Sequence, residues 1–189
     1  MNVLLIGPPG SGKGTQGERL AQRLGLEHIA AGDLLRAEVE AGTPLGEKVR
    51  EFMERGELVP DELIIDLVMP RVLAAARDGG YLLDGFPRSV GQAREARRLA
   101  EQEGFSADAA IYLDVPREEL VNRILARAKI EGRSDDTSEV VRRRLAVFDD
   151  ATAPLVEYYR DRGLLRVVDA NRSADEVTAA ILAELERVA

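Results

Sequence analysis

At residues 7–15 the chain has the sequence Gly-Pro-Pro-Gly-Ser-Gly-Lys-Gly-Thr, and the segments on either side of it decide the fold we expect. Residues 3–6 are aliphatic and bounded by Gly and Pro, which predicts a buried strand. After the loop, apolar residues recur at helical spacing as far as Leu24, and Gly25 is a typical helix stop. Strand, glycine-rich loop and helix are the context in which a Gly-x4-Gly-Lys pattern indicates a phosphate-binding loop.

The residue types in this loop suit a phosphate chain. Gly10, Gly12 and Gly14 let backbone N–H groups point inward at a helix N-terminus, which carries partial positive charge. Lys13 adds a charge that reaches toward the β- and γ-phosphates. The pattern departs from the usual one because Gly14 stands where Ser or Thr is common, and Thr15 follows one place later. The alternative is a glycine-rich connection without a ligand, but the complete spacing favours a bound phosphate chain.

The composition indicates a globular protein with a single core. The chain has 189 residues, of which 45% are hydrophobic and 32% charged. No apolar run approaches the roughly 20 residues that span a membrane, and no signal-peptide pattern is present. A net charge of −8 argues against general nucleic-acid binding. Because there is no cysteine, disulfides and thiolate metal sites are excluded, which fits a reducing compartment.

Apolar runs typical of strands alternate with helical stretches along the whole chain. This alternation implies right-handed crossovers and a parallel sheet covered by helices on both faces. We therefore expect a three-layer α/β/α P-loop fold with a five-stranded parallel sheet. The predicted strands are 3–6, 27–30, 81–84, 109–113 and 165–169.

Local signals also predict the ends and interruptions of helices. Pro70 lies inside a helix expected from Pro60 to about residue 77 and should kink or split it. Ser89 and Gln92 match a capping box. A long helical stretch over 137–159 should be interrupted near Pro154.

Ligands of such sheets bind beyond the carboxyl ends of the strands. The phosphate loop, Asp33, the 84–88 turn and residues 171–172 all fall there. Arginines are concentrated at the same edge, and guanidinium groups match phosphate oxygens bidentately. They are Arg36, Arg88, Arg123, Arg127, Arg133 and Arg144.

The chain offers few groups that activate a nucleophile, since it has one histidine and no cysteine. A phosphate acceptor is already ionised near neutral pH and needs no base, so positioning and charge neutralisation by arginines, Lys13 and Mg²⁺ suffice. An alcohol acceptor would instead need a carboxylate base, for which Asp33 and Asp84 are candidates. Asp84, at a strand end, also suits the outer shell of a magnesium ion, with Thr15 of the loop as the second candidate.

Five motifs resemble those of the adenylate kinases, and the match covers essentially the whole chain in order. The second, third and fifth are specific to nucleoside monophosphate kinases. The motifs are GPPGSGKGTQ (7–16), GDLLR (32–36), LDGFPR (83–88), GRSDD (132–136) and TAPLVEYY (152–159). The resemblance implies that a monomeric cytoplasmic enzyme transfers a phosphoryl group reversibly from MgATP to AMP, giving two ADP. It implies no nucleic-acid or membrane partner.

The resemblance also implies an internal organisation of one P-loop kinase domain over 1–189. Two parts would be mobile: a monophosphate-binding segment at 30–59 and a short lid at 128–138, without the cysteines that bind zinc in some relatives. The core would comprise 1–29, 60–127 and 139–189.

Site residues follow from the resemblance by position. ATP would be bound by Gly10, Ser11, Gly12, Lys13, Gly14, Thr15, Arg127 and Arg172. AMP would be bound by Ala31, Arg36, Glu57, Leu58, Val59, Gly85, Phe86, Pro87, Arg88, Gln92, Arg133 and Arg144. Catalysis would fall to Lys13, Arg88, Arg123, Arg133 and Arg144. Closure of the lid would exclude water and bring its arginines to the transferring group.

One position departs from the family pattern. Adenylate kinases usually carry Ser-Thr before Gly32, whereas this chain has Ala30 and Ala31. An alanine there resembles the uridylate and cytidylate kinases, so a UMP/CMP-type or broad-specificity enzyme is the alternative. Gln92 resembles the residue that recognises adenine, because its amide pairs with both a donor and an acceptor. We favour AMP, with looser base discrimination than in a Thr-bearing relative.

Two further classes of protein compete with this interpretation. A P-loop kinase acting on a small alcohol does not account for the arginines around the lid or for the 85–88 motif. A guanine-nucleotide switch would be expected to show an Asn-Lys-x-Asp motif, which the sequence lacks.

Overall fold

A computed structural model describes residues 1–131 and 138–188, with the backbone alone for 127–131 and for Ser138. Within these residues, five strands form one sheet in the order β2-β3-β1-β4-β5, and every pairing is parallel. The strands are β1 (Asn2–Ile6), β2 (Glu27–Ala30), β3 (Tyr81–Asp84), β4 (Ala109–Asp114) and β5 (Leu165–Asp169). The predicted α/β class and parallel sheet are therefore confirmed.

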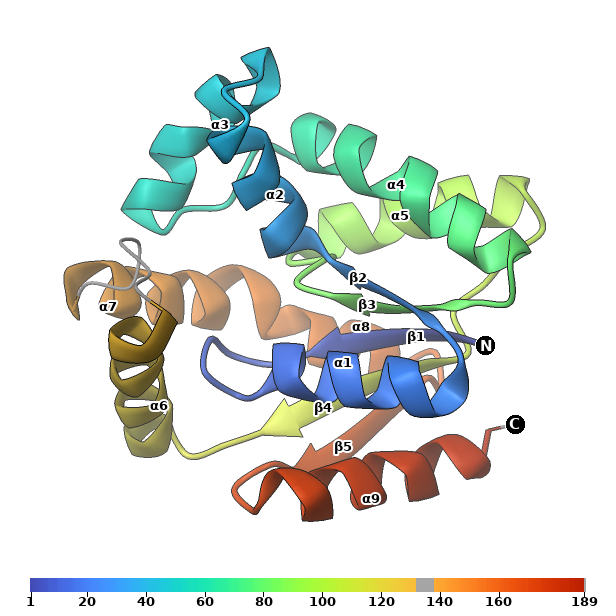
Figure 1. Ribbon diagram of the computed structural model, residues 1–189. Helices are drawn as coiled ribbons and strands as arrows, with labels where there is room; N and C mark the ends of the chain where they lie inside the picture. Colours follow the sequence, from blue (N-terminus) through green and yellow to red (C-terminus); the bar gives the residue numbers. More distant parts are fainter. Residues whose placement is uncertain (132–137, 189) are drawn as a thin grey trace.

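Helices cover both faces of this sheet (Figure 1). The cover includes α4, α5 and α8 on one face and α1 and α9 on the other, while α2 and α3 extend beyond the sheet. The helices are α1 (Lys13–Leu24), α2 (Ala31–Glu40), α3 (Pro44–Arg55), α4 (Asp61–Arg77), α5 (Val90–Gln102), α6 (Arg117–Glu131), α7 (Ser138–Val147), α8 (Pro154–Arg160) and α9 (Ala174–Glu186). None of the helices in the described residues is long and apolar enough to cross a membrane.

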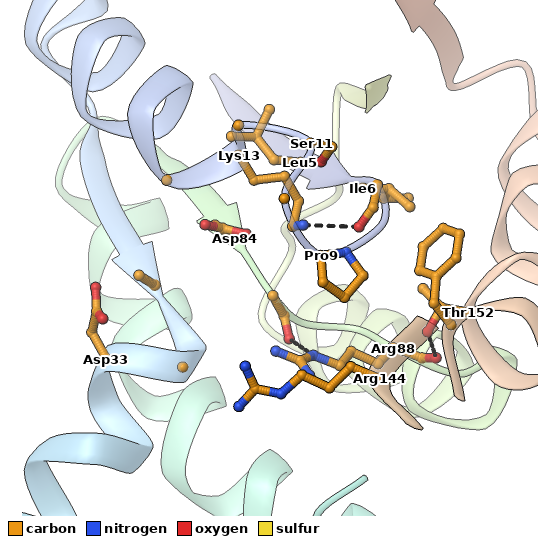
Figure 2. Close-up of a pocket in the computed structure, with 18 of the residues that line it drawn as sticks. Leu5, Ile6, Pro9, Ser11, Lys13, Asp33, Asp84, Arg88, Arg144 and Thr152 are labelled. Atoms are coloured by element: carbon orange, nitrogen blue, oxygen red, sulfur yellow. Dashed lines mark hydrogen bonds between the residues drawn. The ribbon is translucent and has the colours of Figure 1, made fainter. Parts of the chain in front are cut away.

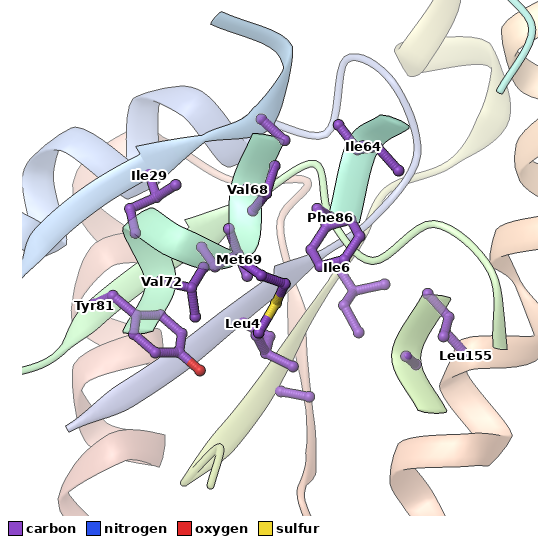
Figure 3. Packing of buried hydrophobic residues seen from close by; sticks show 14 of the residues in the cluster. Leu4, Ile6, Ile29, Ile64, Val68, Met69, Val72, Tyr81, Phe86 and Leu155 are labelled. Carbon is purple, nitrogen blue, oxygen red and sulfur yellow. The ribbon is translucent and has the colours of Figure 1, made fainter. Parts of the chain in front are cut away.

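Alternate residues of the central strand β1 supply the two hydrophobic cores. Leu4 and Ile6 face a core built with α4 and its neighbours, which includes Val68 and Met69 (Figure 3). Val3 and Leu5 face the opposite core, formed with residues of α1, α6, α7 and α9. A strand buried on both faces explains why residues 3–6 are all apolar.

Helix α4 continues through Pro70, so Pro70 does not split it, and of the two predicted effects only the kink stays a prediction. Proline removes one intrahelical hydrogen bond, whose acceptor belongs to Asp66. Both Pro70 and Asp66 are exposed, so water can replace the missing donor. Val68 and Val72 are buried in the core next to Pro70 and hold the helix against the sheet.

The long helical stretch before Pro154 is interrupted, as predicted, but the interruption begins earlier than expected. Helix α7 ends at Val147 and is followed by a π-helical turn, η1 (Phe148–Thr152). The N–H of Ala153 donates to the carbonyl of Phe148 at 2.8 Å, one residue further back than in an α-helix. Pro154 has no N–H to donate, so the turn before it widens.

Candidate functional site

A cleft of about 770 Å³ lies at the carboxyl ends of the strands, in the volume range of small-molecule binding sites. The loop after β1, the start of α1, part of α2, the 56–59 segment and the turn after β3 line it on one side. Parts of α6, α7 and the turn after β5 complete the lining. Segments far apart in the sequence therefore meet at the edge where a ligand was expected.

The loop after β1 has a backbone that only glycine adopts easily at two positions. Gly10 has φ +83° and Gly12, the N-cap of α1, has φ +94°. A Cβ atom on Gly10 would also lie 2.8 Å from Cγ1 of Ile124 and 2.9 Å from the carbonyl oxygen of Leu120. The conformation that presents the N-terminus of α1 to the cleft thus depends on these glycines.

Lys13 lies at the first residue of α1 and lines the cleft (Figure 2). Its Nζ donates to the carbonyls of Gly7 at 2.8 Å and of Pro8 at 3.0 Å. The ammonium group is therefore held beside the loop, where a phosphate chain would lie.

Asp84 and Thr15 bring oxygen atoms to the floor of the same cleft. Asp84 ends β3, opposite Leu5 of β1, and its Oδ2 lies 3.9 Å from the position that a Cβ of Gly14 would occupy. Thr15 is exposed at the cleft. Among residues 1–131 and 138–188, no group of three or more His, Asp or Glu side chains is placed to hold a metal ion.

Arg88 is held through both its side chain and its backbone carbonyl (Figure 2). Its Nε donates to the carbonyl of Gly85 at 2.8 Å, and its own carbonyl accepts from Oγ1 of Thr152 at 2.8 Å. Thr152 belongs to the π-helical turn, so this turn is bonded to the backbone of Arg88.

The charges around Arg88 are mostly positive. Protein atoms enclose its guanidinium on most sides while it keeps contact with the solvent of the cleft, and this desolvation lowers the pKa of Arg88 from its usual value. Arg144 and Arg36 lower that pKa further through repulsion, and Asp84 opposes them. Three arginines close enough to repel one another favour the binding of a multiply charged anion.

Two of these arginines lie beside glycines of the cleft. Gly85 has φ +79°, and a Cβ there would lie 3.4 Å from Nη2 of Arg88. A Cβ on Gly32 would lie 3.4 Å from Nη1 of Arg36, which is paired with Asp33. The guanidinium groups of Arg36 and Arg88 therefore pack directly against backbone.

Two more of the expected residues lie at the far side of the cleft. Arg123 of α6 donates from Nη1 to the carbonyl of Ala170 at 3.1 Å and pairs with Glu119 at 2.9 Å. Arg172 donates from Nε to Oδ2 of Asp169 at 2.8 Å. These contacts connect α6 with the turn after β5.

Most of the residues predicted for the site line this one cleft, but Ala31 and Phe86 do not. Each is 1% exposed and lies in the hydrophobic core. Arg127 belongs to α6, in the part where only the backbone is described, and Arg133 lies outside the described residues. The residues of the prediction that line the cleft are Gly10, Ser11, Gly12, Lys13, Gly14, Thr15, Arg36, Glu57, Leu58, Val59, Asp84, Gly85, Pro87, Arg88, Gln92, Arg123, Arg144 and Arg172.

The capping box predicted for Ser89 and Gln92 is half formed. Oγ of Ser89 accepts from the N–H of Gln92 at 3.1 Å. However, Oε1 of Gln92 accepts from the N–H of Arg88 at 2.7 Å, and its Nε2 donates to Oδ1 of Asp61 at 2.8 Å. Gln92 therefore joins α5 to the start of α4.

Sequence reasoning did not select Thr152, Asp61 or Gln16 as site residues. Thr152 opens a motif noted above only for its resemblance, which is the one signal that pointed to it. Gln16 lines the cleft and donates from Nε2 to the carbonyl of Ala174 at 2.9 Å, which ties α1 to α9. No local pattern distinguishes Asp61 from the next acidic residue, Glu62.

Comparison with known proteins gives one consistent result. The family model for adenylate kinase matches residues 5–164. The chain is 50% identical to an adenylate kinase of Thermus thermophilus over 183 residues, which are 97% of this chain and 96% of the relative. It is 46% identical to an adenylate kinase of Stenotrophomonas maltophilia over 186 residues, 98% of this chain and 100% of the relative. An adenylate kinase of Xanthomonas campestris is 50% identical over 177 residues, 94% of this chain and 95% of the relative.

Proposed function

The chain belongs to the adenylate kinase family, and from that premise we propose how its own residues carry out the reaction. It transfers a phosphoryl group from ATP to AMP and so gives two ADP. The comparisons give no support to UMP or CMP as the acceptor, although Ala31 resembles the residue of those kinases. The observation that carries the proposal is the meeting of Arg88, Arg144 and Arg36 in one cleft with the phosphate loop.

On the donor side, the loop residues Gly10 to Thr15 bind the phosphates of ATP. Their backbone N–H groups and the N-terminus of α1 supply partial positive charge, and Lys13 supplies a full charge. The turn after β5 binds the adenosine end of ATP together with Arg127. Arg123 holds this turn, and Arg172 is part of it. The bond between Arg123 and the carbonyl of Ala170 supports this placement.

On the acceptor side, Arg36 and Arg88 bind the phosphate of AMP. The 57–59 segment, Gly85 and Gln92 line the part of the cleft that receives the nucleoside. Phe86 and Ala31 support this part of the cleft from the hydrophobic core, because their side chains are buried there. Pro87 lines the cleft as part of the turn after β3.

The transfer requires no general base from the protein. An oxygen of the AMP phosphate, which is ionised near neutral pH, attacks the γ-phosphorus, and the bond to the β–γ bridging oxygen breaks. Arg88, Arg144 and Lys13 neutralise the charge that spreads over the transferring group. Arg123 and Arg133 are expected to assist from α6 and the lid.

Thr15 and Asp84 fit the needs of a magnesium ion that enters with ATP, because both offer hard oxygen atoms beside the loop. A magnesium ion held there would supply positive charge that stabilises the phosphates of ATP during transfer. These two residues would hold and orient it.

We also propose that 30–59 and 128–138 move relative to the remaining core. Helices α2 and α3 support this for the first segment, because they extend beyond the sheet (Figure 1) and pack closely on each other. Arg143 of α7 pairs with Glu57 at 3.3 Å, which is a contact that closure would form and opening would break.

The enzyme is proposed to act as a cytoplasmic monomer. The cleft supports the monomer, since residues of a single chain line both of its sides. Light scattering coupled to gel filtration should give a mass near 20.7 kDa at assay concentrations. A mass of twice that value would contradict the monomer.

The experiment that tests the function is a coupled assay of ADP formation from ATP with AMP, CMP or UMP as the acceptor. Activity should require both ATP and AMP, and the Lys13→Ala variant should lose it while its circular dichroism is unchanged. Lys48→Ala is the matched control, because it removes an exposed lysine of α3 and should keep full activity.

Two results would count against the proposal. ATP consumption that does not depend on any monophosphate would indicate a hydrolase or a switch protein. Activity retained in Lys13→Ala would remove Lys13 from the mechanism.

A further inference from the structure

The side-chain amide of Gln92 is held at both of its ends. Gln92 is 2% exposed, in the first turn of α5, and it lines the cleft. Oε1 accepts from the backbone N–H of Arg88 at 2.7 Å, and Nε2 donates to Oδ1 of Asp61 at 2.8 Å. A backbone N–H only donates and a carboxylate only accepts, so these two partners allow a single orientation of the amide.

These two hydrogen bonds use half of the donors and acceptors of the amide and leave the other half unused. A primary amide has two lone pairs on oxygen and two N–H groups on nitrogen. Arg88 uses one lone pair and Asp61 uses one N–H. One acceptor and one donor of the amide therefore remain for a ligand in the cleft.

The remaining pattern distinguishes two purines of almost the same shape. The Watson–Crick edge of adenine has an N6 donor beside an N1 acceptor, which complements an amide oxygen and N–H in that order. Hypoxanthine has an O6 acceptor beside an N1–H donor, which is the reverse order. An amide that can rotate by 180° would accept both bases, whereas a fixed amide accepts one.

We propose that Asp61 is the positioning residue that determines base specificity, because it holds Gln92 in the orientation that pairs with adenine and not with a 6-oxopurine. The inference rests on the proposed function in one respect, namely that Gln92 recognises the base of the acceptor. Reversal of the amide would face its NH₂ to the N–H of Arg88 and its oxygen to the carboxylate of Asp61. Both of these pairs repel, so reversal is opposed at each end.

The place of Asp61 in the fold suits this task. It is the first residue of α4, and only Pro60 separates it from the 57–59 segment that lines the cleft. The backbone of Gln92 is itself fixed by Oγ of Ser89 at 3.1 Å. The carboxylate of Asp61 and the amide of Gln92 therefore meet from the first turns of α4 and α5.

The test compares AMP with IMP as acceptor at saturating ATP, in the parent enzyme and in Asp61→Asn. The Asn amide is close in shape to the carboxylate, but it can present NH₂ to a reversed Gln92 and so removes one of the two repulsions. We expect the ratio of kcat/KM for AMP over IMP to fall about tenfold, mainly because the value for IMP rises. The KM for ATP should not change.

A matched control is available in the same helical turn. Glu62→Gln removes an exposed carboxylate from the next residue of α4 and changes the charge at the helix start in the same way. It should leave the AMP/IMP ratio unchanged. Asp61→Ala is a second variant, which removes the acceptor altogether and should change the ratio in the same direction as Asp61→Asn.

The outcomes separate this inference from the one on which it rests. If Asp61 only stabilises the fold, both substrates lose activity equally and the ratio stays the same, which overturns the inference. Gln92→Leu removes the recognising amide and should collapse the ratio; an unchanged ratio in Gln92→Leu would show that Gln92 does not recognise the base. A collapse in Gln92→Leu with no change in Asp61→Asn or Asp61→Ala would leave the proposed function intact and remove only the role of Asp61.

Discussion

Gly17 of helix α1 lies against the ring of His28 of strand β2, and an added methyl group there has a calculable effect. A Cβ on Gly17 would lie 2.2 Å from Nε2 of His28, 2.7 Å from its Cε1 and 2.8 Å from its Cδ2. Comfortable contacts between such atoms are about 3.5–4.0 Å. The Gly17→Ala methyl group therefore overlaps the imidazole by more than an ångström at its closest atom, and either the ring or the helix must move.

Two opposing effects determine the stability of Gly17→Ala. Replacing glycine by alanine inside a helix contributes about 1 kcal/mol of stability. Overpacking of this kind costs about 1–3 kcal/mol. The overlap is large, because three atoms of the ring lie within 2.8 Å of the added methyl group, so we expect a net loss of about 1–2 kcal/mol. For a chain of this length that corresponds to a thermal midpoint lower by roughly 2–8 °C.

The assay is urea denaturation and thermal melting of Gly17→Ala in two backgrounds, the parent and His28→Ala. With the imidazole removed, the same substitution should become stabilising by about 1 kcal/mol, because only the gain in helix propensity remains. The KM for ATP should rise only in the parent background, since α1 carries the phosphate loop at its N-terminus. Equal stabilisation in both backgrounds would refute the reasoning, because it would mean that the ring turns aside without cost.

Four further predictions concern the cleft. Arg144→Ala should lower kcat on the order of a hundredfold, whereas Arg142→Ala, an exposed arginine of the same helix, should match the parent in steady-state rates; equal losses in both would point to a general effect of charge. Thr152→Val removes the hydroxyl that donates to the carbonyl of Arg88, and should cost about 1 kcal/mol in urea denaturation and raise the KM for AMP, while an unchanged KM would remove Thr152 from the site. Ala31→Thr should increase the preference for AMP over CMP and UMP in kcat/KM, at some cost in stability because Ala31 is 1% exposed; unchanged ratios would show that this position does not affect the base. Removal of Mg²⁺ with EDTA should abolish transfer, and added MgCl₂ should restore it; transfer that persists in EDTA would contradict a metal requirement.

Most strand and helix positions were predictable because local signals decide them. The strands at 27–30, 81–84 and 165–169 appear at the predicted residues. Ser173 and Glu176 form a capping box, and their spacing of three residues before an apolar run is a local signal of this kind. Pro70 does not split α4, because the packing of Val68 and Val72, which a local rule omits, keeps the helix continuous.

The sequence predicted which residues belong to the candidate site, but it did not predict how they are bonded to one another. The resemblance selected Arg88, Arg144 and Gln92, and all three line the cleft. It did not indicate that Gln92 is held by Asp61 or that Thr152 fixes Arg88. The partners in these bonds are 31 and 64 residues apart, so no spacing rule along the chain connects them.

The amino-acid sequence by itself determined the alternation of strands and helices, the phosphate loop and the residue types gathered at one edge of the sheet. These features depend on hydrophobic period, glycine conformation and capping, which act between residues close in the chain. Only the tertiary structure decided which arginines repel one another around Arg88, and which groups fix the amide of Gln92. Such contacts exist because two cores bring separate helices to the same edge of the sheet, and their distances follow from that packing.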